Sequence, residues 1–201
     1  MTYETARAEL RAAELALMQQ RETVAELRRK LPPGPSTADY EFQSPSGPVR
    51  LSELVTGGRP LVLYHFMYGK QQASPCPMCS MWADGWNAVA HHIAENVDFA
   101  LVSDAPIDET LALADERGWT DLQWLSSHDS TFKVDIGGAD DAGNQWPFLS
   151  TWEAGADGPR LAYSGGAPID GEHWRGLDLL SPVWHLLDLT RDGRGDWMPS
   201  V

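Results

Sequence analysis

The sequence predicts an α/β fold in which helices cover both faces of a largely parallel sheet, preceded by a helical arm. Residues 61–68 are apolar on both faces apart from His65, which is typical of a central strand covered on both sides. Strand-like and helix-like segments alternate from there to residue 134, and two strand-like segments separated by a Gly-rich turn follow. Parallel strands linked by helices, with a hairpin at the end, indicate a three-layer α/β/α sandwich.

The arm is predicted as one helix from residue 2 to about residue 30. Thr2 can cap its start, and the Pro-rich linker that follows Leu31 ends it. A heptad seam runs along this helix, formed by Tyr3, Ala6, Leu10, Ala13, Leu17, Gln20, Val24, Leu27 and Leu31. The seam either pairs with a second copy of the chain or lies along its own domain, and we favour the homodimer. We therefore divide the chain into an arm with its linker (1–35) and one α/β domain (36–201).

The remaining elements follow from periodicity and turn residues. Two short strands flank a Pro/Gly turn between residues 40 and 51, and Gly118 ends a helix that starts at Pro106. The other predicted elements are a helical turn at 52–55, the helix from Pro77 to about Ala94, strands at 97–103 and 122–126, a short helix at 130–134, a hairpin at 148–153 and 160–164, and a mainly helical segment at 174–189.

Cys76 and Cys79 are the only cysteines, and they stand at the predicted strand-to-helix junction. A Cys-x-x-Cys pair there is the thioredoxin-type redox arrangement, so the sandwich is expected to be thioredoxin-like. With Pro77 as the first helical residue, Cys76 becomes the N-cap, where backbone N–H groups and the helix dipole lower the pKa of a thiol. Cys79, one turn further, should be less exposed. We expect Cys76 to attack a disulfide and Cys79 to resolve the product.

Two other interpretations of the cysteine pair are open. A structural zinc site needs about four ligands, but the chain has no second Cys-x-x-Cys, and His91 and His92 are adjacent rather than at ligand spacing. Both cysteines could instead be inert apolar side chains. We expect no metal and no cofactor.

Composition narrows the functional classes. The chain has 201 residues, 42% of them hydrophobic, which is enough for one domain with a substantial core. Residues 1–30 hold six Lys/Arg and five Asp/Glu, whereas the remaining 171 residues hold nine and 24, a net charge of −15. So acidic a body is expected to bind no nucleic acid. No apolar run reaches the roughly 18–20 residues of a membrane span, and the N-terminus lacks a signal peptide's apolar stretch, so we expect a cytoplasmic protein without membrane contact.

Pro77, which places Cys76 at the start of the helix, is one of five candidates for supporting roles beside the cysteine pair. The other four are Pro147, His65, Trp82 and Asp84. Pro147 directly precedes the hairpin, where thioredoxin-like folds place a cis proline, and an ordinary trans bond is the alternative. His65 is either a thiolate partner or a buried structural histidine. Trp82 follows Cys79 by three residues and either walls the redox site or packs in the core. Asp84 is either a supporting acid or a surface carboxylate. Outside these five, Arg175 either pairs an anionic substrate or bridges Asp178, and we favour the bridge.

Four segments carry a resemblance to a known family. They are Tyr-His-Phe-Met-Tyr-Gly at 64–69, Cys-Pro-x-Cys-Ser-x-Trp-Ala-Asp at 76–84, Trp-Arg-Gly-Leu-Asp at 174–178 and Leu-Asp-Leu-Thr at 187–190. With the N-terminal helix and residues 47–54, they resemble the thioredoxin-like domain-of-unknown-function family often labelled predicted dithiol-disulfide isomerase, related to the alkyl hydroperoxide reductase/thiol-specific antioxidant group. The resemblance implies a thioredoxin-like fold and a redox role for Cys76 and Cys79, and it supplies no substrate.

Four functions are therefore compared. The leading one is a dithiol–disulfide oxidoreductase acting on a protein or a small-molecule thiol or disulfide. A peroxiredoxin-like peroxidase is the second, but the pattern Pro-x-x-x-Thr-x-x-Cys is missing its hydroxyl, since Ala73 stands three residues before Cys76. A Cys-pair metallochaperone is the third, because two thiolates suit soft ions. The fourth is a non-catalytic dimer in which the arm is the functional part.

Overall fold

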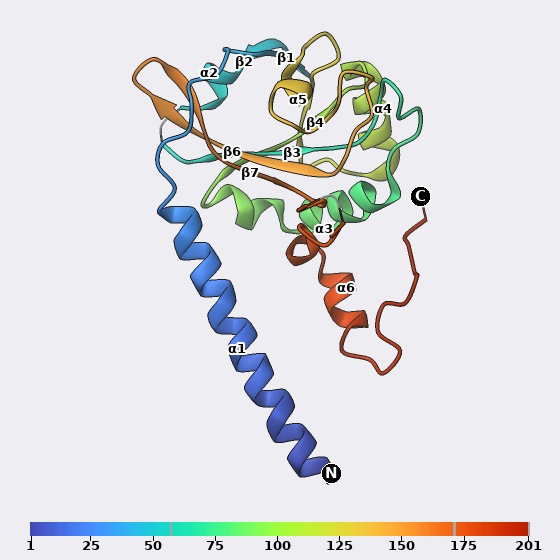
Figure 1. The fold of residues 1–201 in the computed structure, drawn as a ribbon. Helices are drawn as coiled ribbons and strands as arrows, with labels where there is room; N and C mark the ends of the chain where they lie inside the picture. The colour runs from blue at the N-terminus through green and yellow to red at the C-terminus, as the bar shows by residue number, and fades with distance from the viewer. Residues whose placement is uncertain (57, 171, 201) are drawn as a thin grey trace. The chain divides into compact units, whose positions relative to one another are not determined.

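The structure is a computed structural model that describes residues 1–56, 58–170 and 172–200. It divides into two compact units, Met1–Gly34 and Pro35–Val201. The first unit holds a single long helix, and the second holds the sheet and the remaining helices (Figure 1).

One sheet organises the second unit. Its strand order is β2-β1-β5-β4-β3-β6-β7, with β3, β4 and β5 parallel and the outer strands antiparallel to their neighbours. The strands are β1 (Glu41–Ser44), β2 (Gly47–Arg50), β3 (Leu61–His65), β4 (Asp98–Ser103), β5 (Gln123–Ser126), β6 (Phe148–Gly155) and β7 (Gly158–Gly166).

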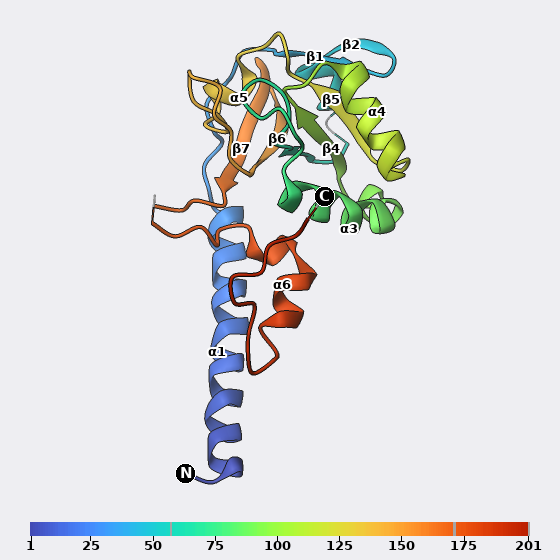
Figure 2. The same cartoon turned by 90° about the vertical axis from the view of Figure 1, so that its right-hand side faces the viewer.

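Helices cover both faces of this sheet, as Figures 1 and 2 show for α3 and α6 on one side, and Figure 1 for α2 and α5 on the other. This confirms the predicted α/β/α sandwich with an N-terminal helix. The helices are α1 (Tyr3–Arg29), α2 (Leu51–Leu54), α3 (Pro77–Ala94), α4 (Ile107–Arg117), α5 (Phe132–Asp135), the 3₁₀ turn η1 (Asp178–Leu180) and α6 (Pro182–Leu187).

The central strand β3 separates two apolar cores, because successive side chains of a strand point to opposite faces. Tyr64 lies in the core shared with α3, which also holds Cys79 and Trp82. Leu63 lies in the core on the α5 side, with Phe132. The cysteine pair therefore faces only the side chains that β3 sends toward α3.

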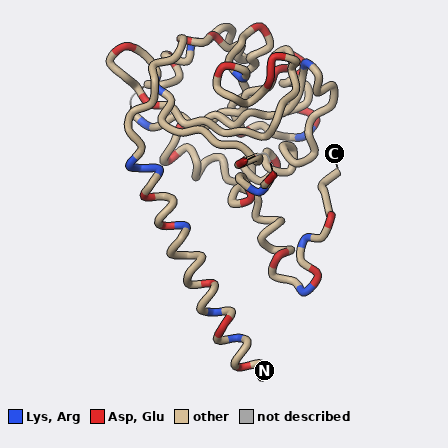
Figure 3. Tube along the Cα trace, viewed as in Figure 1, with Lys and Arg blue, Asp and Glu red and all other residues tan. Residues whose placement is uncertain are grey.

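Helix α1 has the predicted extent and cap. The hydroxyl of Thr2 accepts a hydrogen bond from the backbone N–H of Thr5 at 3.3 Å, and none of its 27 residues is buried. Acidic and basic residues are interspersed along it, as the colours of the backbone trace in Figure 3 show. The seam residues Leu10, Leu17 and Leu27 are about half exposed or more, at 51%, 58% and 60%. No helix among the described residues is long and apolar enough to span a bilayer.

The prediction of a mainly helical segment at 174–189 is wrong for its first part. The backbone N–H of Gly176 donates to Ala167 O at 2.9 Å, so this stretch pairs with the chain that leaves β7 instead of coiling. A Cβ at position 176 would collide with the carbonyl oxygen of Gly166, so only glycine permits the approach. Pro182 then separates η1 from α6, since it has no N–H to continue a helix.

Two smaller differences concern the residues around the site. Strand β3 ends at His65 rather than at residue 68, because Phe66 leads into the loop toward Cys76. The peptide bond before Pro147 is trans, and no cis bond occurs among the described residues.

Candidate functional site

Cys76 caps the N-terminus of α3, with Pro77 at the first helical position as predicted. Its own N–H donates to Met67 O at 3.1 Å, which ties the cysteine to the loop that leaves β3. Its carbonyl accepts from both the backbone N–H of Ser80 at 2.9 Å and the Ser80 hydroxyl at 3.1 Å. The start of the helix is therefore held through both peptide groups of the cysteine.

Both cysteines are reduced thiols and both are buried, Cys76 at 5% exposure and Cys79 at 0%. A hydrogen bond from the Cys79 thiol lowers the pKa of Cys76 to about 6, against the opposing effect of burial, and the backbone N–H groups of Cys79 and Met78 lower it further. The pKa of Cys76 thus falls in the predicted direction, with the neighbouring thiol as the largest cause and the helix N-terminus as the next favourable one.

The surroundings of Cys79 act in the opposite direction. Complete burial raises the pKa of its thiol well above the ordinary value, and the hydrogen bond to Cys76 raises it further. The hydroxyl of Tyr64 lies 3.1 Å from Cys79 Sγ, donates to it, and opposes that rise. At neutral pH one thiol of the pair is therefore largely ionised and the other protonated.

Tyr64 is a site residue that the sequence analysis missed. It is fully buried, and the Trp82 and Trp86 rings pack edge-on against it at centroid distances of 5.5 and 4.7 Å. The available signal was its place on the central strand, one residue before His65 and on the other face. A hydroxyl on the helix-facing side of that strand is within reach of the second cysteine.

A buried lysine holds the loop that precedes Cys76. Lys133 is 1% exposed, and its ammonium group donates to Phe66 O at 2.7 Å and to Gln145 Oε1 at 2.9 Å. The Gln145 amide in turn donates to Gly69 O at 2.8 Å. Burial lowers the pKa of Lys133 to about 8. No sequence pattern predicts the pairing of Lys133 with Gln145, because an isolated lysine in a four-residue helix carries no signal of burial.

His65 lies on the face of the sheet opposite the cysteines. Its Nε2 is 3.0 Å from Ser150 Oγ, and its ring stacks on Phe132 at 5.3 Å. Burial lowers the pKa of His65 well below its ordinary value, so the imidazole is neutral. This placement matches the structural histidine of the two roles that the sequence left open.

Trp82 and Asp84 occupy different surroundings on α3. Trp82 is buried in the core with Cys79 and Tyr64, and it also lines a groove beside the start of α3. The carboxylate of Asp84 accepts from Arg117 Nη2 at 3.0 Å and from Trp119 Nε1 at 2.8 Å. Asp84 thus links α3 to the end of α4, and these hydrogen bonds involve neither cysteine.

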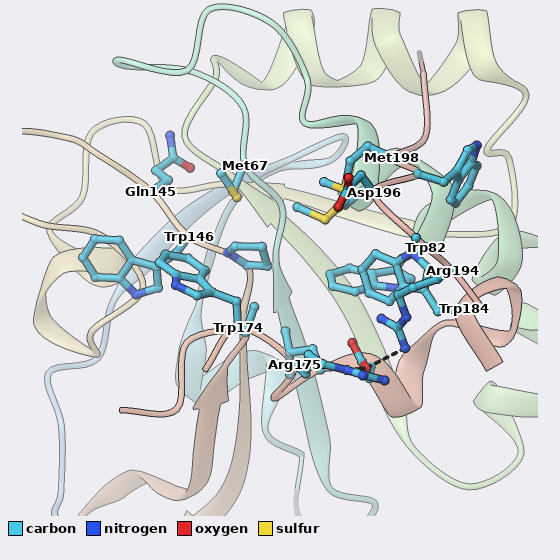
Figure 4. A pocket seen from close by; sticks show the side chains of 17 residues that line it. Met67, Trp82, Gln145, Trp146, Trp174, Arg175, Trp184, Arg194, Asp196 and Met198 are labelled. Carbon is cyan, nitrogen blue, oxygen red and sulfur yellow. Dashed lines mark hydrogen bonds and ion pairs between the residues drawn. The ribbon is translucent and has the colours of Figure 1, made fainter. Parts of the chain in front are cut away.

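Pro147 borders a groove of about 570 Å³ that runs along the first turn of α3 (Figure 4). Met78, between the two cysteines, lines the same groove, as does Met67, whose carbonyl accepts from Cys76. The structure thus brings Pro147 and Trp82 together beside the cysteine motif. Arg175 also lines it and bonds Asp178 at 2.5 Å, which confirms the predicted bridge.

No group of three or more His, Cys, Asp or Glu side chains among the described residues is arranged to hold a metal ion. What the site offers is a pair of thiols of unequal acidity. The low-pKa thiol stands at a helix N-terminus and the protonated one is buried behind it, an arrangement suited to thiol–disulfide exchange.

Fold and site together define a thioredoxin-like protein with a dithiol at the start of the helix that follows the central strand. The chain belongs to the family described as bacterial protein of unknown function (DUF899), whose model matches residues 1–200. No curated protein matches the chain.

Solved structures similar to this one include peroxiredoxins. Peroxidoxin BcpB from Mycobacterium tuberculosis is 22% identical with a TM-score of 0.51, and the match covers 71% of this chain and 88% of that one. A cysteine-to-serine mutant of Xanthomonas campestris peroxiredoxin Q is 15% identical with a TM-score of 0.52, over 75% and 94% of the two chains. At these identities the likeness establishes the fold, and it confirms the predicted thioredoxin-like architecture.

Proposed function

We propose that the protein is a thiol–disulfide oxidoreductase in which Cys76 is the attacking thiolate and Cys79 the resolving thiol. The observation that carries the proposal is the asymmetry of the pair. Cys76, at the N-terminus of α3, has a pKa of about 6, while the pKa of Cys79 is raised by full burial. A low-pKa thiolate is the nucleophile of disulfide exchange, and a second thiol one turn away completes it.

The reaction proceeds in two exchanges. The Cys76 thiolate attacks one sulfur of a partner disulfide, a new S–S bond forms to Cys76, and the other partner sulfur leaves as a thiolate that takes up a proton. Cys79 then loses its proton and attacks Cys76 Sγ, which closes the Cys76–Cys79 disulfide and releases the second partner thiolate. The dithiol gives two electrons to the partner, and a dithiol reductant restores the reduced pair.

Tyr64 supports the second exchange. Cys79 must become a thiolate inside the core, where burial opposes charge. The Tyr64 hydroxyl donates to Cys79 Sγ at 3.1 Å, and a hydrogen bond stabilises an ionised acceptor more than a neutral one. Tyr64 is therefore a positioning residue for the resolving sulfur.

Peroxide reduction is the second candidate, favoured by the fold shared with peroxiredoxins. In that reaction the Cys76 thiolate attacks the O–O bond, becomes a sulfenic acid and releases water or an alcohol. Cys79 then condenses with the sulfenic acid to give the disulfide and water. Ala73 supplies no hydroxyl at the position where peroxiredoxins carry Thr, which places this reaction second.

We also propose a cytoplasmic location. A reducing compartment keeps a pair like Cys76 and Cys79 as thiols and makes its disulfide transient, as a catalytic pair requires.

Trapping of the mixed disulfide tests the proposed function. Cys79→Ser leaves Cys76 able to attack but unable to be resolved, so intact mass of the variant purified from cells should show a covalent adduct that reductant removes. Cys76→Ser is the matched control and should carry none. Absence of any adduct on Cys79→Ser, in cells and with added disulfides, would contradict the proposal.

A further inference from the structure

The groove beside the cysteine motif is lined by tryptophan and methionine side chains that take no part in the disulfide exchange itself. Its volume of about 570 Å³ lies in the range of small-molecule sites, roughly 300–1,000 Å³. Figure 4 shows Trp146 and Trp174 at one end, Trp82 and Trp184 at the other, and Met67 between them. The side chains come from the β3 loop, α3, the loop before β6 and the segments after β7, so the tertiary fold assembles the groove.

Several of these apolar side chains are exposed. Trp174 is 60% exposed, Trp197 46% and Met198 58%, although each borders the groove. Large apolar groups gathered around a concavity indicate a binding surface, whereas scattered ones do not. Indole rings and thioether chains give flat, polarisable walls suited to aromatic ligands.

Both arginines that line the groove are paired with carboxylates. Arg194 Nη2 bonds Asp178 at 2.8 Å and Asp188 at 2.7 Å, and Arg175 bonds the same two carboxylates at 2.5 and 3.2 Å. Each guanidinium thus has two carboxylate partners and neither is left to receive an anionic ligand. The acidic excess of residues 31–201, 24 Asp/Glu against nine Lys/Arg, also repels anions.

The end of the groove nearest the cysteines limits the size of the ligand and offers it one hydrogen-bond donor. Cys76 is only 5% exposed, so the sulfur that it attacks must sit on a slender group rather than on a broad folded surface. Trp82 lines the groove, and its indole N–H is buried without a hydrogen-bond partner among the described residues. A ligand carbonyl that reached this donor would satisfy it.

We infer that the groove is the substrate site of the oxidoreductase and takes an uncharged small organic disulfide, or its thiol, that carries an aromatic group. The inference rests on the proposed function for its chemistry. The aromatic group occupies the indole-lined groove, and the sulfur reaches the start of α3 past Met78. The charge balance excludes anionic thiols as preferred substrates.

A matched set of three disulfides, each made from a derivative of N-acetylcysteine, tests the inference. The measurement is the rate at which the wild-type dithiol reduces each of them. The benzylamide is uncharged and aromatic, the methylamide uncharged without a ring, and the free acid anionic. We expect the benzylamide to react about tenfold faster than the methylamide, and the free acid to be slowest, since one buried ring contributes about the free energy of a tenfold rate difference. Trp174→Ala should bring the benzylamide-to-methylamide ratio close to one. Ile169→Ala removes an exposed side chain that does not line the groove and should keep the ratio.

The outcomes separate this inference from the proposed function. Equal rates for the three disulfides, or a faster free acid, would overturn the groove assignment and leave the oxidoreductase standing. A disulfide-linked peptide with aromatic flanks that reacts far faster than the benzylamide would overturn the small-molecule assignment.

A binding measurement tests the groove even if the wild-type protein reduces none of the three disulfides. S-methyl-N-acetylcysteine benzylamide cannot exchange, so its binding is independent of the redox reaction. Saturable quenching of tryptophan fluorescence that Trp174→Ala weakens would support the site, and absence of quenching would overturn it.

Discussion

Cys76 and Cys79 are three residues apart, but their thiols differ strongly in pKa because their surroundings differ. Cys76 receives a hydrogen bond from its partner thiol and from backbone N–H groups, while Cys79 is enclosed by the core. Ionisation of Cys76 stabilises the dithiol relative to the disulfide, which raises the reduction potential of the pair and makes its disulfide form a stronger oxidant. The acidity of one sulfur is therefore the residue-level property on which the function depends.

The pH dependence of alkylation tests the acidity of Cys76. The rate at which iodoacetamide modifies Cys76, followed by peptide mass, should rise through about pH 6 and level off above pH 7, because the thiolate is the nucleophile. Cys79→Ala removes the donating thiol and should move the midpoint upward. A wild-type midpoint near the ordinary value of 9.0 would contradict the assignment.

The same shift has a stability consequence with a definite sign. The folded-state pKa of Cys76 lies below its ordinary value, so ionisation stabilises the folded, reduced protein. That contribution is fully present above pH 9 and is lost as the pH falls through about 6.

Removal of the Tyr64 hydroxyl tests the second exchange. Tyr64→Phe keeps the aromatic packing but removes the donor to Cys79, and a hydrogen bond to a charged group contributes about 1.5–3 kcal/mol. We expect the mixed disulfide to resolve at least about tenfold more slowly, with its pH midpoint raised, in rapid-quench mass measurements.

Tyr40→Phe is the matched control, since that hydroxyl donates to Asp135 and Tyr40 packs with the core on the α5 side. Equal resolution rates in the wild type and Tyr64→Phe would show that Cys79 ionises without this help.

The sequence predicts the cysteine motif well and its surroundings poorly. Spacing and Pro77 alone define the N-cap and the less exposed second cysteine, because both are local properties of a helix start. The hydrogen bonds of Tyr64, Lys133 and Gln145 join residues 15, 67 and 76 positions apart. Such pairs depend on tertiary packing, and no local sequence pattern predicts them.

At the level of elements, periodicity predicts what is long and regular. Helix α3 has the predicted bounds Pro77–Ala94, and helix α4 ends at Gly118, whose φ of 70° is the expected left-handed cap. The segment at 174–189 shows why the prediction of other elements is wrong. Its apolar pattern suits a helix, but the pairing of Gly176 with the end of β7 overrides that preference.

Helix α1 carries an apolar heptad seam along one side. Its seam residues Leu10 and Leu17 are 51% and 58% exposed, and a two-stranded seam would bury them. We propose that α1 pairs with α1 of a second copy to form a homodimer.

Lysines on the seam test this pairing. Leu10→Lys with Leu17→Lys should convert a dimer into a monomer in sedimentation equilibrium, because each lysine would have to be buried without a partner. Ala8→Lys with Leu15→Lys places the same charges on the outer face of the helix and should leave the dimer intact. A wild-type protein that sediments as a monomer would contradict the pairing.

At the scale of the whole molecule, the sheet and α3 supply the dithiol, and the segments around the sheet supply the groove. The thioredoxin-like architecture follows from the alternation of strands and helices, so it could be predicted. The groove could not, because its walls come from segments that are distant in sequence, among them Met67, Trp146 and Trp197. The chain has nine tryptophans, and the sequence does not indicate which of them line the groove.

The central claim is that Cys76 and Cys79 interconvert between dithiol and disulfide. Redox titration tests it most directly: the wild-type protein is equilibrated in graded dithiol/disulfide buffers, alkylated, and read by intact mass. We predict a reversible two-electron transition that disappears in Cys76→Ser and in Cys79→Ser. Two thiols that remain reduced across the whole biological range of potential would contradict the account.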